Sequence, residues 1–163
     1  MGCLNIFVKG FAIFVVVLEI LSLYPMVVRL LTEENLDDIS LYDWIRYTVN
    51  VVLLILLFFI LIFIWMGIRK RSFKIITMAK VLQAIRIATK GITFVLLIWG
   101  YAAMVSENGP AHDNEEYKNM FWLHFFSPKA AILILEIVFL ITLCILRKSL
   151  IEEHTGVTIV ELK

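Results

Sequence analysis

Cysteine and charge are both scarce in this chain. Of its 163 residues, two are cysteines, three are prolines and 18 % are charged. Cys3 and Cys144 are too few to build the disulfide framework that holds many small secreted domains together. Long stretches of the chain carry almost no charge at all. This lack argues against a soluble fold, because so short a chain cannot hide the remaining apolar surface from water.

Motifs that carry chemistry are also missing. The sequence has no nucleotide-binding glycine pattern, no CxxC pair and no nucleophile with a matching base, so we expect no enzyme, no cofactor and no metal. His112 and His124 flank the acidic segment 113–116. Their spacing fits no recognised ligand pattern, and a solvated loop is the simpler interpretation.

Apolar residues are abundant, and their arrangement predicts the fold class. They make up 61 % of the chain, against about 45–50 % in soluble domains, and the mean hydropathy is +0.92. Each apolar stretch approaches the roughly 20 residues that a helix needs to cross a bilayer. Helices are expected because lipid leaves an open backbone without hydrogen-bond partners. We therefore predict an all-α integral membrane four-helix bundle, a single domain over 1–163, with spans at about 6–28, 48–68, 85–105 and 129–146 and a tail at 147–163.

The first apolar stretch has one alternative interpretation, a cleaved signal peptide. No small-x-small cleavage site follows it, since the run ends in Leu23-Tyr24-Pro25-Met26. A retained helix is therefore the better prediction. Pro25 is expected to kink this helix or to end it at its outer edge.

Charge is distributed unevenly among the connections. The first, 29–46, has five acidic residues against two arginines, and the third, 106–129, has four acidic residues against two lysines. The middle connection, 69–90, has seven cations and no acid, and Arg147 and Lys148 follow the last span. Short cytosolic loops carry the excess of lysine and arginine. The pattern predicts that the N- and C-termini are both cytosolic.

The basic middle connection has a second possible role, contact with anionic lipids on the cytosolic side. A helix here would place Lys80, Gln83, Arg86 and Lys90 along one side, and each cation near the headgroups contributes about 1 kcal/mol. The same cations are also explained if they only fix the orientation of the spans in the membrane. The two interpretations are compatible. Nucleic-acid binding is not expected from a loop held against a membrane. The predicted lipid contacts are Arg69, Lys70, Arg71, Lys74, Lys80, Arg86 and Lys90.

Two carboxylates lie near the middle of predicted spans. Glu19 belongs to the first span and Glu136 to the fourth, and a charge at that depth costs about 2.5–3.5 kcal/mol on insertion scales. First and last helices of a simple bundle are neighbours, so the carboxyls are expected to approach each other, where they cannot both ionise. One interpretation is structural: the acids bond to Ser22, Thr93 or Thr142 on adjacent helices. The other is a proton or cation site.

Smaller features add two candidates. Cys3 follows Gly2 at the predicted cytosolic edge of the first span, which makes it a lipidation candidate. Ala84, Ala88, Gly91, Gly100 and Ala103 would allow a close helix approach in the third span.

The chain begins MGCLNIFVKG and runs directly into a span, and its predicted outer loops, TEENLDDISLYDW and NGPAHDNEEYKNMFWLHFFSPK, are acidic and lack cysteine. They also lack the tryptophan and cysteine motifs of claudins and tetraspanins. In length, in plan and in these loops the chain resembles the small four-span insect septate-junction proteins of the Pasiflora type. The resemblance implies a protein that helps to assemble the paracellular barrier at lateral junctions of the plasma membrane, with other membrane proteins or itself as partner.

The sequence therefore favours a non-enzymatic membrane scaffold that associates laterally within the bilayer. One alternative is a small channel, transporter or auxiliary subunit that uses the intramembrane carboxylates. A further alternative is an endosomal trafficking adaptor, to which the tail EEHTGVTIVELK lends little support.

Overall fold

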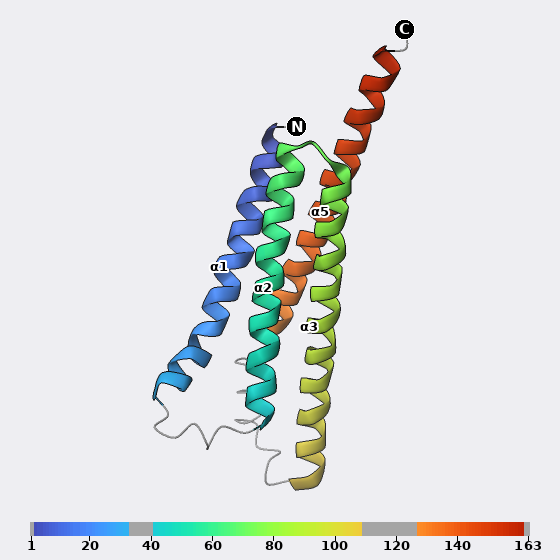
Figure 1. Cartoon of the computed structure of the whole chain (residues 1–163). Helices are drawn as coiled ribbons and strands as arrows, with labels where there is room; N and C mark the ends of the chain where they lie inside the picture. The colour runs from blue at the N-terminus through green and yellow to red at the C-terminus, as the bar shows by residue number, and fades with distance from the viewer. Residues whose placement is uncertain (1, 33–40, 109–126, 162–163) are drawn as a thin grey trace. The chain divides into compact units, whose positions relative to one another are not determined.

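The computed structural model describes residues 2–32, 41–108 and 127–161, and the secondary structure in these ranges is helical. The helices are α1 (Gly2–Thr32), α2 (Leu41–Arg69), α3 (Phe73–Asn108) and α5 (Ser127–Glu161) (Figure 1). Within the described residues, four helices are long and apolar enough to cross a membrane. This result confirms the predicted all-helical class and the number of candidate spans, and it is the pattern of a multi-pass membrane protein.

The boundaries of the candidate spans differ from the predicted ones, most of all in the third. The structure gives Gly2–Tyr24, Tyr47–Arg69, Phe73–Gly100 and Ser127–Thr155. The helix of the third candidate span thus begins at Phe73, before the predicted span at 85–105. The cations after Phe73 lie on the helix that the sequence allowed for this segment, in which apolar residues recur at helical spacing.

Contact clustering divides the chain into two compact units, Met1–Gln83 with Phe139–Lys163 and Ala84–Val138. In the first unit, α1 and α2 lie side by side (Figure 1). Its core uses one face of each helix, such as Val8, Ala12 and Val15 from α1 at spacings of four and three residues. Phe11 meets Phe139 of α5 edge to face, with 5.5 Å between the ring centroids.

The connection between α2 and α3 is a tight turn. The N–H of Ser72 donates to the Gly67 carbonyl at 2.9 Å, and the N–H of Arg71 donates to the Ile68 carbonyl at 3.4 Å. These two bonds form a Schellman motif, which needs a left-handed residue just after the helix. Arg71 is that residue, with a φ of 49°. Ser72 is the N-cap of α3, and its carbonyl accepts from the Ile76 N–H at 3.4 Å.

Most of the predicted tail at 147–163 is a continuation of α5. The sequence predicted that the fourth span ends at about residue 146, but α5 continues as one helix to Glu161. Leu146 and Leu150 are both buried in the first unit. The segment 147–161 is therefore a helical extension, anchored by packing beyond the predicted span end.

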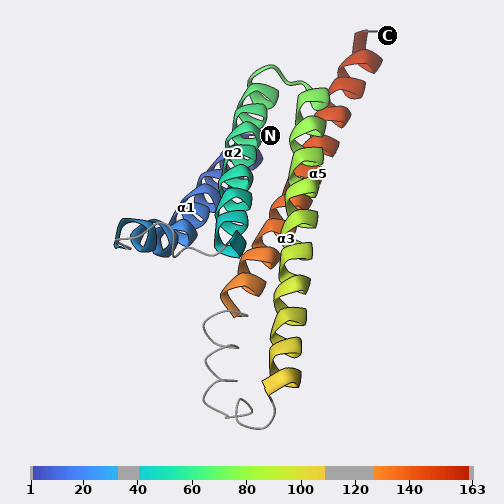
Figure 2. The same cartoon turned by 60° about the horizontal axis from the view of Figure 1, so that its bottom comes forward.

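Pro25 does not end α1, which continues to Thr32. Figures 1 and 2 show that α1 bends towards its C-terminal end. Proline removes one helical hydrogen bond and crowds the preceding turn, so a bend there has an identifiable cause. Of the two predicted effects of Pro25, the structure thus contradicts the helix stop and fits the kink.

Candidate functional site

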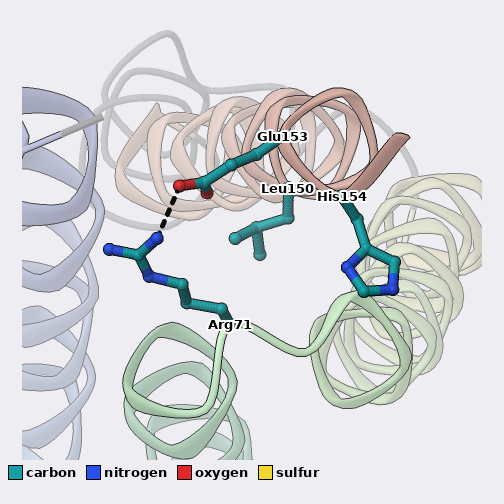
Figure 3. Close-up of a pocket in the computed structure, with 4 residues that line it drawn as sticks. All are labelled: Arg71, Leu150, Glu153 and His154. Atoms are coloured by element: carbon teal, nitrogen blue, oxygen red, sulfur yellow. Dashed lines mark hydrogen bonds and ion pairs between the residues drawn. The ribbon is translucent and has the colours of Figure 1, made fainter. Parts of the chain in front are cut away.

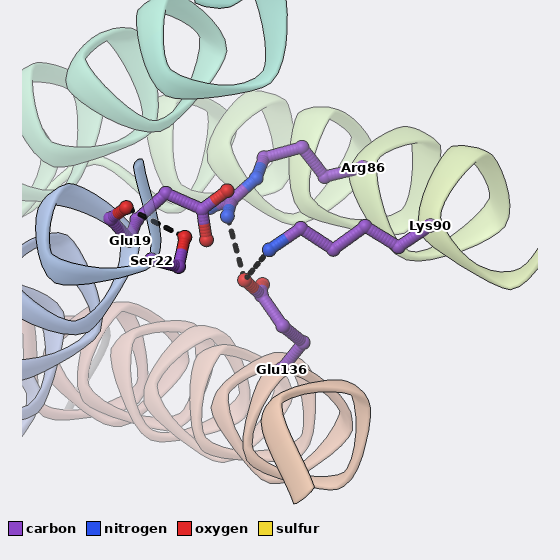
Figure 4. A network of polar contacts seen from close by, with 5 residues as sticks. All are labelled: Glu19, Ser22, Arg86, Lys90 and Glu136. Carbon is purple, nitrogen blue, oxygen red and sulfur yellow. Dashed lines mark hydrogen bonds and ion pairs between the residues drawn. The ribbon is translucent and has the colours of Figure 1, made fainter. Parts of the chain in front are cut away.

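The main polar group lies in the second unit and centres on the carboxylate of Glu136. Its Oε1 accepts a hydrogen bond from Arg86 Nη2 at 2.6 Å and another from Lys90 Nζ at 2.9 Å (Figure 4). The side chains of Arg86 and Glu136 are 0 % and 1 % exposed, and that of Lys90 is 15 % exposed. We call these three residues the buried charge cluster.

The helices explain how this cluster forms. Arg86 and Lys90 are four residues apart on α3, so both side chains leave the same face of the helix. Glu136 is on α5, and one oxygen of its carboxylate, Oε1, forms an ion pair with each of the two cations. Opposite charges that share their desolvation cost can be buried together, whereas each one alone would be expensive in an apolar medium. The cluster therefore ties α3 to α5 within the second unit.

This geometry corrects the lipid-contact prediction for part of the middle segment. Gln83 and Arg86 were expected to face the headgroups, but both are 0 % exposed. Lys90 is largely covered and bonded to Glu136. At Arg86 and Lys90 this side of the helix thus faces protein and not lipid, because both cations bond to the carboxylate of Glu136.

The remaining cations of the middle segment are not buried. Arg69, Lys70 and Lys74 are exposed, and Lys80 is half-buried. Arg71 is 76 % exposed at its side chain. For these five, contact with anionic lipid stays a prediction.

Glu19 belongs to the first unit, where it is 5 % exposed within α1. The Ser22 hydroxyl donates to the backbone carbonyl of Glu19 at 2.7 Å (Figure 4), and the Thr93 hydroxyl donates to the Thr89 carbonyl at 2.9 Å. Both hydroxyls therefore donate to carbonyls of their own helices, and the structural interpretation of the two acids stays a prediction. The predicted approach of Glu19 to Glu136 stays a prediction.

A second polar group lies in the first unit, where α5 passes the α2–α3 turn. Arg71 Nη1 donates to Glu153 Oε1 at 2.8 Å (Figure 3). Arg71, Leu150, Glu153 and His154 line an open pocket of about 100 Å³. Six residues before Glu153 on α5, Arg147 Nε donates to the hydroxyl of Thr77, in the second turn of α3, at 2.9 Å. One polar contact thus holds the extension of α5 to the α2–α3 turn and one holds it to α3, and Leu150 is buried between them.

One further contact in the first unit has no counterpart in the sequence predictions. The ammonium of Lys9 lies 4.4 Å from the ring centroid of Trp65, which is cation–π distance. Cys3 and Cys144 are both exposed. Lipidation of Cys3 stays a prediction.

Two of the small residues predicted to allow close packing, Gly91 and Gly100, do not meet a neighbour within the described residues. A Cβ added at Gly91 or Gly100 would find no atom within 4 Å. The close approach is at Gly67 in α2, where an added Cβ would lie 2.5 Å from Cδ1 of Ile76. Sequence spacing indicated the wrong glycines because it cannot show which side of a helix faces protein.

The acidic segment with His112 and His124 lies outside the described residues. Among the residues that are described, no group of three metal-ligating side chains gathers.

No protein-family model matches this chain, and comparisons with curated proteins and with solved structures give no match. The resemblance to septate-junction proteins of the Pasiflora type therefore stays a prediction. Among the residues that the structure describes, the buried charge cluster and the α2–α3 turn are two polar sites built around ion pairs.

Proposed function

We propose that this chain is a non-enzymatic membrane scaffold with four spans, which associates laterally with a second copy or with other membrane proteins. We further propose that both termini are cytosolic and that the protein resides in the plasma membrane at lateral, septate-junction-like cell contacts. The resemblance noted in the sequence supports the junctional part of this proposal.

The observation that carries the lateral association is an exposed face on α3. Ala84, Ala88, Ile92, Val95 and Trp99 are all exposed and recur every three or four residues. They lie on the side of the helix opposite Arg86 and Lys90. Small residues let helix backbones approach closely in a membrane, so this face suits a partner helix better than lipid alone. We call it the α3 face.

The extent of burial supports the same choice of helix. In the most apolar window of each candidate span, 11 % of the third is buried, against 28–33 % of the others. A helix that buries little against its own chain has the most surface left for another membrane protein. A scaffold needs such a surface, and a self-contained bundle does not.

Cross-linking tests this proposal directly. In a background with Cys3→Ser and Cys144→Ser, Ala88→Cys should form disulfide-linked dimers under mild oxidation in native membranes. Ile134→Cys is the matched control, since Ile134 is exposed on α5 and away from the α3 face. Equal cross-linking at both positions, or at neither, would contradict lateral association through α3.

Imaging tests the location separately. A tagged chain expressed in a polarised epithelium should concentrate at lateral borders. A vesicular pattern would favour the trafficking adaptor over the junctional scaffold.

A channel, transporter or auxiliary subunit is the second candidate, and the buried charge cluster favours it. Ionisable residues within a membrane often mark an ion or proton path. Glu136→Gln removes the charge at almost constant shape, as does Glu19→Gln in the first unit. Unchanged ion flux in both variants with normal localisation would remove the support for transport, and a lost flux would favour it.

A further inference from the structure

We propose that Ser72, in the turn between α2 and α3, is a phosphorylation site for a protein kinase that recognises basic substrates. This inference rests on the proposed cytosolic location of the turn, where ATP and kinases are present. The partner is therefore a serine kinase, which would hold Ser72 in its catalytic cleft beside bound MgATP.

The sequence around Ser72 has the charge pattern that such a cleft requires. Arg69, Lys70 and Arg71 precede the serine directly, and Lys74 follows it by two residues. Kinases select substrates by matching charge patterns of this kind. The same cations would then surround the new phosphate, which binds arginine and lysine by strong charge-assisted hydrogen bonds.

The conformation of Arg71 is the structural observation that singles out this turn. Arg71 has a φ of 49°, in the left-handed region where glycine is the usual residue. The chain keeps an arginine there, and its side chain binds Glu153 at 2.8 Å. The guanidinium of Arg71 thus contacts the α5 extension directly beside Ser72.

The backbone hydrogen bonds of this turn differ in length. Two of its backbone hydrogen bonds are long, at 3.4 Å, one donated by Arg71 and one accepted by Ser72. Bonds of this length lie beyond the usual range for N–H to O contacts. Ser72 is partly exposed. The four cations around it are exposed as well: Arg69, Lys70, Arg71 and Lys74.

The chemical step is an ordinary phosphoryl transfer. The Ser72 hydroxyl oxygen forms a bond to the γ-phosphorus of ATP, and the bond from that phosphorus to the β–γ bridging oxygen breaks. ADP leaves with the electron pair, and the hydroxyl proton passes to the kinase's catalytic carboxylate. The product carries a charge of about −1.5 to −2 beside Arg71.

This charge would compete with Glu153 for the guanidinium of Arg71. Because the Arg71–Glu153 pair is one of the contacts that hold the α5 extension to the turn, phosphorylation is expected to loosen the extension near Glu153. It would also offset about two of the cations that are predicted to contact the headgroups, which weakens attraction to anionic lipid.

The first experiment measures phosphate incorporation into the purified full chain in detergent, with MgATP and the catalytic domain of a kinase that prefers basic substrates. We expect about one phosphate per chain, mapped to Ser72 by mass spectrometry. Ser72→Asn should lose the label, and asparagine keeps the N-cap intact. Ser149→Ala should keep it, which makes it the matched control, because Ser149 also follows two cations.

Two results would overturn the proposal. One is label that persists in Ser72→Asn and maps elsewhere, for example to Ser149. The other is an unlabelled full chain under conditions in which a peptide of residues 67–78 is labelled, since the fold would then conceal the serine. Failure of the cytosolic topology is a different result, detected by tags in cells and not by this assay.

The second experiment measures amide hydrogen exchange in the α5 extension. Phosphorylation should speed exchange around 150–155 by up to about fivefold, which is the weight of an exposed ion pair. Glu153→Gln should give the same increase without phosphate, and phosphorylation should add little to it. Unchanged exchange in the phosphorylated protein would show that Ser72 does not act through Arg71.

Discussion

At the residue scale, the buried charge cluster makes a sharp prediction about Glu136. Glu136→Gln leaves Arg86 and Lys90 without their carboxylate in an apolar site, and breaking such a buried pair costs about 3–5 kcal/mol. Unfolding in mixed detergent and SDS, followed by circular dichroism, measures this loss. Glu152→Gln is the control, because Glu152 is 67 % exposed and its partner Lys148 is 3.8 Å away, so less than about 1 kcal/mol should be lost.

The triple variant Arg86→Met, Lys90→Met and Glu136→Met tests whether the cluster stabilises the fold by more than the mutual compensation of its charges. Replacing a whole buried ion cluster by apolar side chains is often neutral or stabilising. We therefore expect the triple variant to unfold at or above the midpoint of the natural chain. If it is as unstable as Glu136→Gln, the cluster contributes more than mutual compensation of charge.

The site was only partly predictable from the sequence. Glu19 and Glu136 were found because a carboxylate deep in an apolar run is unusual whatever the packing. Arg86 and Lys90 were assigned to lipid because periodicity shows that residues share a face and not which way that face points. Arg71 was counted as one cation among many, since its left-handed backbone has no sequence signal when the residue is not glycine.

At the element scale, the α2–α3 hairpin depends on Gly67. In Gly67→Ala the new Cβ would lie 2.5 and 2.8 Å from two side-chain carbons of Ile76. Ile76 is 0 % exposed, so its side chain has little room to move, and overpacking of this kind costs about 1–3 kcal/mol. The same SDS titration measures it.

Gly91→Ala is the control for this prediction. Nothing lies within 4 Å of an added Cβ there, so alanine should be neutral or gain up to about 1 kcal/mol of helix propensity. A loss at Gly91 equal to that at Gly67 would mean that backbone flexibility and not packing governs both glycines.

The α5 extension offers a second prediction at this scale. Leu150 is 3 % exposed between the contacts of Arg147 and Glu153, so Leu150→Ala should cost about 2–5 kcal/mol. Ile145→Ala is the control, since Ile145 is 53 % exposed on the same helix. Proteolysis of the extension should accelerate in the first variant only. Equal cleavage rates in the two variants would show that the extension is not docked through Leu150.

At the scale of the whole molecule, the helical class and the number of candidate spans followed from length and hydropathy alone. Each apolar run approaches a bilayer thickness, and lipid permits little besides a helix. The third span was predicted to begin at residue 85 because the cations around it, Arg86 and Lys90 among them, looked like the edge of a membrane, whereas the helix itself begins at Phe73. Paired with Glu136, they are compatible with a buried position, and pairing between distant segments is not visible in a hydropathy window.

The orientation of the spans is the last prediction, and it survives the reassignment of Arg86 and Lys90. The turn still has Arg69, Lys70, Arg71 and Lys74 without a nearby acid in sequence, and short basic connections stay cytosolic. In a background with Cys3→Ser and Cys144→Ser, Lys70→Cys should react with a membrane-impermeant maleimide only after permeabilisation. Ser127→Cys, at the start of α5, should react in intact cells. The reversed pattern would mean that the topology is inverted. The cations of the turn would then lie on the side of the membrane away from the anionic cytosolic lipids and from ATP.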